Sequence, residues 1–217
     1  MENTHSTRPE FYTYHNEAMA PLPFAQAEYD QRIAGLRKIM QDQDLTAVVL
    51  TSMHNIAYYS GFLYCSFGRP YACVVTHDTT HTISAGIDAG QPARRSACAN
   101  ITYTDWKRDN YWRAVKSCTG GAKSIGIEGD HLTLMAQQKL QEFLGPQKIT
   151  DIAPATMLQR MIKSSAEIAL IKEGARIADV GGFAIRDAIK VGTREIDVAM
   201  AGRDAMELEI AKRFPDA

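Results

Sequence analysis

Tyr71-Ala-Cys-Val-Val-Thr76-His-Asp-Thr-Thr80-His-Thr-Ile-Ser-Ala85 is the stretch that decides the fold of this 217-residue chain. Its two ends, residues 71–76 and 80–85, are short and rich in β-branched side chains, which is typical of strands. The connection at 77–79 is tight, so the two segments are predicted to form an antiparallel pair. Upstream, Thr46-Ala-Val-Val-Leu-Thr51 is short, apolar and branched, and it predicts a buried strand.

Helical and extended patterns alternate on both sides of this stretch. Asp109 is the expected N-cap of one helix, and Gly145-Pro146 is expected to end another. Alternating elements of this kind predict an α/β layer structure with a mixed sheet flanked by helices. Helices are expected at residues 25–43, 54–59, 90–95, 111–118 and 132–143, and further strands at 101–104, 124–128 and 148–152.

The pattern changes after Pro154, where only helical spacing remains. Ser164 followed by Glu167 has the form of a capping box, and Thr193 is the expected cap of a second helix that ends near Phe214. Three segments follow: an extended arm over residues 1–23, an α/β domain over 24–154 and a helical segment over 155–217. The apolar residues of the arm show neither helical nor strand periodicity, so the arm is expected to lie on a partner or to be disordered.

Composition narrows the class of protein. The formal net charge is −1 with both signs interspersed, so nothing favours nucleic acid or an anionic membrane as a partner. No apolar run approaches the roughly 18 residues of a membrane span, and residues 1–23 lack the apolar core of a secretory signal. No G-x-G-x-x-G motif follows a strand, so nucleotide binding has no support. The chain is therefore expected in the cytoplasm.

Neither the cysteines nor the histidines show ligand spacing. The four cysteines form no C-x-x-C pair and are expected to be buried free thiols in a reducing compartment. The six histidines are expected to be surface or hydrogen-bonded side chains, so neither a metal nor a cofactor is predicted. The residues concerned are Cys65, Cys73, Cys98, Cys118, His5, His15, His54, His77, His81 and His131.

The candidate binding residue is Arg69, which lies among aromatic side chains. Its planar guanidinium can bind a carboxylate through two parallel hydrogen bonds. Gly68 permits a tight turn before it, and Pro70 fixes the backbone after it. The sequence therefore favours an anion site from which neighbouring rings exclude water; these rings belong to Phe62, Tyr64, Phe67 and Tyr71.

Read as strings, several segments resemble the N-terminal domain of the creatinase family. The resemblance begins with Tyr58-Tyr59-Ser60 and Phe62-Leu-Tyr-Cys-Ser-Phe-Gly-Arg-Pro-Tyr71 and covers about residues 24–190. Further matches are Gly90-Gln-Pro-Ala-Arg-Arg95, Tyr103-Thr-Asp-Trp-Lys-Arg-Asp-Asn-Tyr111, Ile125-Gly-Ile-Glu-Gly-Asp-His-Leu132, Met161-Ile-Lys-Ser164 and Gly174-Ala-Arg-Ile-Ala-Asp-Val-Gly-Gly182.

The resemblance implies a creatine amidinohydrolase, which adds water to the guanidinium carbon of creatine and releases sarcosine and urea without a metal. In the creatinase and prolidase families an α/β domain precedes a C-terminal "pita-bread" α+β domain, whose sheet carries the catalytic histidine and carboxylates. By the same resemblance, this chain stops before that sheet and should be inactive alone. Phe67 and Arg69 would bind creatine in the active site of the neighbouring subunit of a homodimer.

Two alternatives remain beside this reading. One is the N-terminal part of a metal-dependent prolidase or Xaa-Pro aminopeptidase, and the other is a non-catalytic domain that binds carboxylates or dimerises. The Phe67-Gly-Arg69 segment and the matches around it favour a creatinase over the peptidase, and the non-catalytic domain stays open.

Other charged residues follow strand ends, where α/β proteins often place functional groups. Asp105, Arg108 and Asp109 precede a helix and are expected to cap it and to pair with one another. Glu128, Asp130 and His131 lack obvious catalytic partners in the sequence, so a structural role is expected for them.

Overall fold

The computed structural model describes residues 8–14, 18–63, 68–88 and 90–215. The chain forms two compact units, residues 1–161 and 162–217. The domain boundary predicted at residue 154 stays a prediction. The helix Ala153–Met161 (α6) packs against the helix Gln26–Asp42 (α1) and lies within the first unit.

A seven-stranded mixed sheet forms the centre of the first unit, in the order β1-β5-β4-β3-β2-β6-β7. The neighbours β4–β5, β2–β6 and β6–β7 are parallel, and the other pairs are antiparallel. The mixed α/β architecture predicted from the sequence is confirmed. The strands are β1 (Phe11–Thr13), β2 (Ala47–Leu50), β3 (Ala72–Thr76), β4 (Thr80–Ala85), β5 (Ala99–Tyr103), β6 (Ser124–Ile127) and β7 (Lys148–Asp151).

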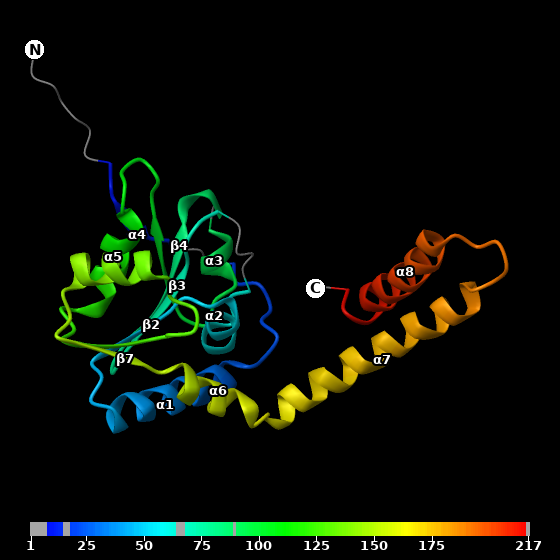
Figure 1. The fold of residues 1–217 in the computed structure, drawn as a ribbon, viewed down its shortest axis with the longest axis horizontal. Coiled ribbons are helices and arrows are strands. Elements are labelled where there is room, and N and C mark those ends of the chain that lie inside the picture. The colour runs from blue at the N-terminus through cyan, green and yellow to red at the C-terminus, as the bar shows by residue number, and fades with distance from the viewer. Residues whose placement is uncertain (1–7, 15–17, 64–67, 89, 216–217) are drawn as a thin grey trace, which may run out of the picture. The chain divides into compact units, whose positions relative to one another are not determined.

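Helices cover both faces of this sheet, as Figure 1 shows for α1 and α6 on one side and α4 and α5 on the other. The predicted helices are confirmed, with ends that differ by a few residues. The helices of the first unit are α1 (Gln26–Asp42), α2 (Met53–Ser60), α3 (Gln91–Arg94), α4 (Asn110–Thr119), α5 (Leu134–Leu144) and α6 (Ala153–Met161), with a short 3-10 turn η1 (Gly86–Asp88).

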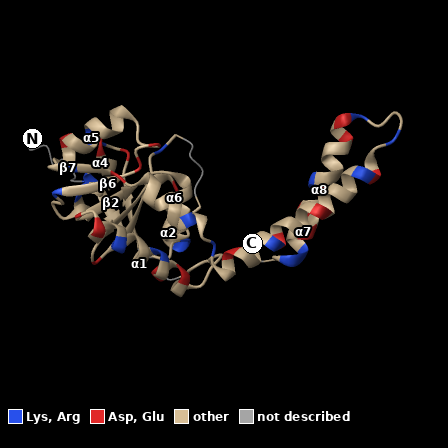
Figure 2. Ribbon diagram, turned by 60° about the horizontal axis from the view of Figure 1, so that its bottom comes forward, with Lys and Arg blue, Asp and Glu red and all other residues tan. Residues whose placement is uncertain are grey.

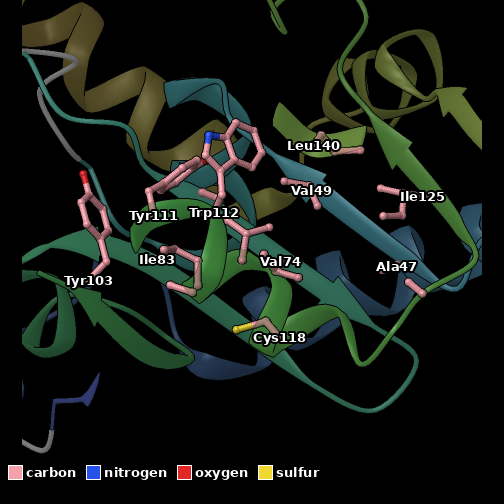
Figure 3. Packing of buried hydrophobic residues seen from close by; sticks show 14 of the residues in the cluster. Ala47, Val49, Val74, Ile83, Tyr103, Tyr111, Trp112, Cys118, Ile125 and Leu140 are labelled. Atoms are coloured by element: carbon pink, nitrogen blue, oxygen red, sulfur yellow. The ribbon is translucent and has the colours of Figure 1, made fainter. Parts of the chain in front are cut away.

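Strand alternation divides the core into two layers. Val49 and Val74 point toward α4 and α5, where they pack with Trp112 and Leu140 (Figure 3). The alternate residues of the same strands, such as Val48, face α1 and α2. Because successive strand side chains point to opposite faces and helices cover both faces, β2 and residues 72–75 of β3 are apolar and buried on both sides.

The N-terminal arm departs from expectation. Phe11–Thr13 forms β1 and pairs antiparallel with β5, so this part of the arm lies on its own domain. The carbonyl oxygen of Pro9 accepts a hydrogen bond of 2.8 Å from Trp106 Nε1, which holds the strand at the edge of the sheet. A strand of three residues is too short to show a period, so the sequence alone could not reveal it.

The second unit is a pair of helices, α7 (Ser165–Ala188) and α8 (Glu195–Arg213). The predicted capping box is present, since Ser164 Oγ accepts from Glu167 N and Glu167 Oε2 accepts from Ser164 N. The predicted Thr193 cap is wrong, because α8 is preceded by Arg194, whose guanidinium binds Asp197 at 2.7 Å. The Asp197 carboxylate is also favourable in the first turn, because the helix N-terminus carries a partial positive charge.

Charges are interspersed along the ribbon, with blue and red positions alternating in both units (Figure 2). Among the described residues, no helix is long and apolar enough to cross a membrane.

Close helix contact in the second unit depends on glycine, which gives a test. A Cβ on Gly202 would lie 2.5 Å from Cγ1 of Ile185 and 3.4 Å from the carbonyl oxygen of Gly181, whereas one on Gly174 would meet nothing within 4 Å. We expect Gly202→Leu to lower the thermal midpoint of the helical circular dichroism signal. The matched Gly174→Leu should raise it, because leucine is favoured over glycine in a helix by roughly 0.8 kcal/mol. Equal shifts in the two variants would contradict this packing.

Candidate functional site

The candidate site lies at the sheet edge where β2 and β6 end. These strands are parallel neighbours, so the residues that follow them meet at one edge. Thr51 follows β2, and Glu128 and His131 follow β6. Crevices at the carboxyl ends of parallel strands are the usual binding sites of α/β proteins.

Glu128 holds this edge together. Its side chain is 2% exposed and accepts hydrogen bonds from the backbone N–H groups of Thr51 and Ser52, from Ser52 Oγ and, at 2.6 Å, from Asn55 Nδ2. Ser52 is also the N-cap of α2 and accepts from Asn55 N. A carboxylate at a helix N-terminus is stabilised by the unpaired N–H groups there. These contacts match the structural role expected for Glu128.

His131 lies in the turn that follows. Its backbone N–H donates to the carbonyl oxygen of Glu128 at 3.2 Å, and its Nδ1 lies 3.0 Å from Thr51 Oγ1. This contact ties the two strand ends together at the side-chain level.

Arg69 lies at the same edge, on the segment that enters β3. Gly68 before it has φ of 77°, the left-handed conformation that glycine permits. The Arg69 side chain is 44% exposed, and its Nε lies 3.4 Å from Oδ2 of Asp105. Its other guanidinium nitrogens form no hydrogen bond with any residue that the structure describes. The fork that could bind a carboxylate is therefore available on its outer side.

Two tyrosines fix the backbone beside Arg69. Tyr103 Oη donates to the carbonyl oxygen of Pro70 at 3.1 Å, and Tyr111 Oη donates to that of Tyr71 at 3.1 Å. The two rings contact each other edge to face with centroids 5.6 Å apart. Burial raises the pKa of the Tyr103 hydroxyl, which therefore stays a donor across the physiological range. Neither tyrosine has a role that the sequence alone reveals, because only the fold brings the two hydroxyls to residues 70 and 71.

The aromatic cluster predicted around Arg69 is present in part. Phe62 and Tyr71 are buried, with ring centroids 5.9 Å apart. Tyr64 and Phe67 lie outside the described residues. The predicted substrate role of Phe67 therefore stays a prediction.

The acidic residues before α4 behave differently from the prediction. Asp105 pairs with Arg69, and Asp109 pairs with Lys139 of α5 at 3.1 Å, so the two do not pair with Arg108. Asp109 occupies the N-cap position but forms no capping hydrogen bond through its side chain, since its backbone is left-handed with φ of 66°. Tertiary ion pairing outweighs local capping here.

Within the described part of the chain, no group of three or more histidine, cysteine or acidic side chains is placed to hold a metal. Cys73, Cys98 and Cys118 are free thiols; the first and last are buried, and Cys65 lies outside the described residues. Burial raises the pKa of the Cys118 thiol to about 11, so it is not poised as a nucleophile at neutral pH.

Residues 32–162 match the family model of the creatinase/prolidase N-terminal domain. The chain belongs to this family. The creatinase/prolidase domain therefore includes the whole edge described above, with Arg69, Glu128 and His131 inside the matched region.

Relatives of two kinds are found. A creatinase of Bacillus sp. (strain B-0618) is 50% identical over 198 residues, which are 89% of this chain and 48% of that protein. A putative dipeptidase, YkvY of Bacillus subtilis, is 25% identical over 174 residues, 77% of this chain and 47% of its own length. The chain thus spans about half the length of these relatives.

Among solved structures, a prolidase from Pyrococcus horikoshii OT3 superposes with a TM-score of 0.69 at 20% identity, over 82% of this chain and 49% of that one. At this identity the similarity shows the fold.

The Glu128 contacts give a test of what holds the site. We expect Glu128→Gln to lower the free energy of unfolding by roughly 1–3 kcal/mol, because the amide NH2 would face buried donors. Asp130→Asn, at an exposed position in the same turn, should change it by less than roughly 0.5 kcal/mol. Urea unfolding followed by fluorescence measures both. A Glu128→Gln variant as stable as Asp130→Asn would show that the carboxylate is dispensable.

Proposed function

We propose that this chain is the N-terminal part of a creatinase that hydrolyses creatine to sarcosine and urea, and that Arg69 binds the substrate carboxylate. The observation that carries the proposal is the Arg69 guanidinium itself, half exposed on a backbone held by two tyrosine hydroxyls. The 50% identity to a Bacillus creatinase, against 25% to a dipeptidase, favours creatine over a peptide as substrate.

The geometry suits a small carboxylate. A planar fork can donate two parallel hydrogen bonds, and a fixed backbone lowers the entropy lost when they form. Asp105 lies 3.4 Å from Nε of Arg69 and both groups are partly exposed, so this pair is weak. The outer nitrogens form no hydrogen bond with the residues that the structure describes and remain for a ligand.

The chemistry of the reaction requires further groups. Water adds to the guanidinium carbon of creatine, and the C–N bond to sarcosine breaks with transfer of a proton to the leaving nitrogen. We propose that the histidine and carboxylates for these steps come from chain beyond residue 217, and that Phe67 and Arg69 reach an active site in the neighbouring subunit of a homodimer. In this proposal the described residues bind the substrate, and α7 and α8 begin a pita-bread domain.

Calorimetric titration of the purified chain with creatine tests the role of Arg69. We expect weak binding of creatine to the unchanged chain. Arg69→Ala should make the free energy of binding less favourable by roughly 1.5–3 kcal/mol, the usual range for a hydrogen bond to a charged group. The control variant is Arg108→Ala, an exposed arginine in the loop after β5. Sarcosine, a carboxylate without a guanidinium, shows whether the rest of creatine contributes. Creatine binding that is unchanged in Arg69→Ala would overturn the role.

A metal-dependent prolidase or aminopeptidase is the second candidate, supported by the fold shared with the Pyrococcus prolidase. The two candidates can be distinguished with a hybrid protein that joins residues 1–217 to the second half of the Bacillus creatinase. Urea release from creatine by this hybrid is measured. Urea release from creatine that falls in the Arg69→Ala hybrid supports the creatinase proposal. A non-catalytic dimerising domain would instead give an inactive hybrid and an isolated chain that dimerises in sedimentation.

A further inference from the structure

A cavity of about 370 Å³ lies between the carboxyl ends of β2 and β6 and the helices α4 and α5. This volume falls within the roughly 300–1,000 Å³ of small-molecule sites. Side chains from five elements or their flanking turns line it, so it exists only in the folded domain. The lining includes Arg69, Tyr71, Asp109, Tyr111, Trp112, Ala136 and Lys139.

One side of the cavity is aromatic. Tyr71, Tyr111 and Trp112 are all buried, and Tyr111 meets Trp112 edge to face with centroids 5.0 Å apart. Figure 3 shows these last two rings side by side. The two tyrosine hydroxyls donate elsewhere, Tyr111 to the carbonyl oxygen of Tyr71 and Tyr71 to the carboxylate of Asp88. The rings therefore offer apolar surface to whatever fills the cavity.

The charges around the cavity favour an anion over a cation. Asp109 is the acidic side chain of the lining, and it already binds Lys139 at 3.1 Å. Lys139 also binds Glu142 at 3.0 Å, so its own charge is balanced. Among the residues described, the ion-pair partner of Arg69 is Asp105, and this contact is weak, which leaves donors and positive charge at the cavity.

We propose that this cavity is a binding site for a small monocarboxylate with a compact apolar body, distinct from creatine. The carboxylate binds the outer nitrogens of Arg69, and the apolar body lies against Tyr71, Tyr111 and Trp112. Creatine fits poorly, because its guanidinium would replace that apolar body and would find the Asp109 carboxylate already paired. An occupant of the cavity competes with creatine for Arg69, so the site regulates access to this residue.

Three ligands of similar size test the proposal: phenylacetate, phenylacetamide and phenethylammonium. The chain has two tryptophans, and their indole N–H signals in a nitrogen-15 spectrum report where a ligand binds. Phenylacetate should shift the Trp112 signal in a saturable manner and leave Trp106 unchanged, since Trp106 does not line the cavity. Phenylacetamide should bind about tenfold more weakly and phenethylammonium more weakly still, since a charged hydrogen bond is lost.

Two variants locate the contacts. Arg69→Gln should abolish the preference for phenylacetate over phenylacetamide, whereas Arg108→Gln, whose side chain does not line the cavity, should keep it. Ala136→Leu adds a larger side chain on the α5 side of the cavity and should weaken the binding of both phenylacetate and phenylacetamide. Unchanged positions for the remaining signals verify that each variant is folded.

The outcomes separate this proposal from the creatinase proposal. Equal affinity for phenylacetate and phenylacetamide, a preference that survives Arg69→Gln, or stronger binding of phenethylammonium would overturn the carboxylate site. In each of those cases the creatinase proposal would still be supported if creatine binding is lost in Arg69→Ala and is unchanged in Ala136→Leu. If phenylacetate binds as expected and creatine does not bind, the result supports the carboxylate site in the cavity and not the creatine-binding role of Arg69.

Discussion

Burial of the Glu128 carboxylate among hydrogen-bond donors is the constraint from which the rest of the site follows. An uncompensated buried charge would be strongly unfavourable, but each oxygen of this carboxylate accepts at least two hydrogen bonds. The donors come from the turn between β2 and α2 and, with Asn55, from the first turn of α2, so the end of β6 and the start of α2 are held at fixed positions. The same turn carries Thr51, which contacts His131 and lines the cavity.

The Arg69 segment is held by a different kind of contact. Tyr103 and Tyr111 come from β5 and α4, and each donates a hydroxyl hydrogen bond to a carbonyl oxygen next to Arg69. The backbone is thereby fixed, while the guanidinium forms one weak ion pair within the described part of the chain. A rigid backbone with an available charged group is the arrangement that binding of a small anion requires. Both proposals depend on this property of one residue, and they differ in whether the ligand occupies the cavity.

Local patterns predicted most of the elements because their signals are local. Residues 46–51 and 71–85 are apolar and branched, and they form β2, β3 and β4 close to the expected positions. The capping box at Ser164 was also predictable, since both partners lie within four residues of each other. The two errors have different causes. Asp109 binds Lys139, thirty positions away, instead of capping α4, whereas at α8 a local ion pair between Arg194 and Asp197 stands where a Thr193 cap was expected.

The sequence by itself determined the α/β class, the family and the identity of Arg69 as a candidate, because strand composition, string similarity and side-chain chemistry are all properties of residues close together in the chain. Only the tertiary structure decided that Arg69 lies beside Asp105, that two tyrosines hold its backbone and that Glu128 joins two strand ends. It also decided that the N-terminal arm forms an edge strand. Each of these contacts joins residues more than thirty positions apart. Such pairs meet only when the order and direction of the strands are fixed, and no local pattern specifies that order.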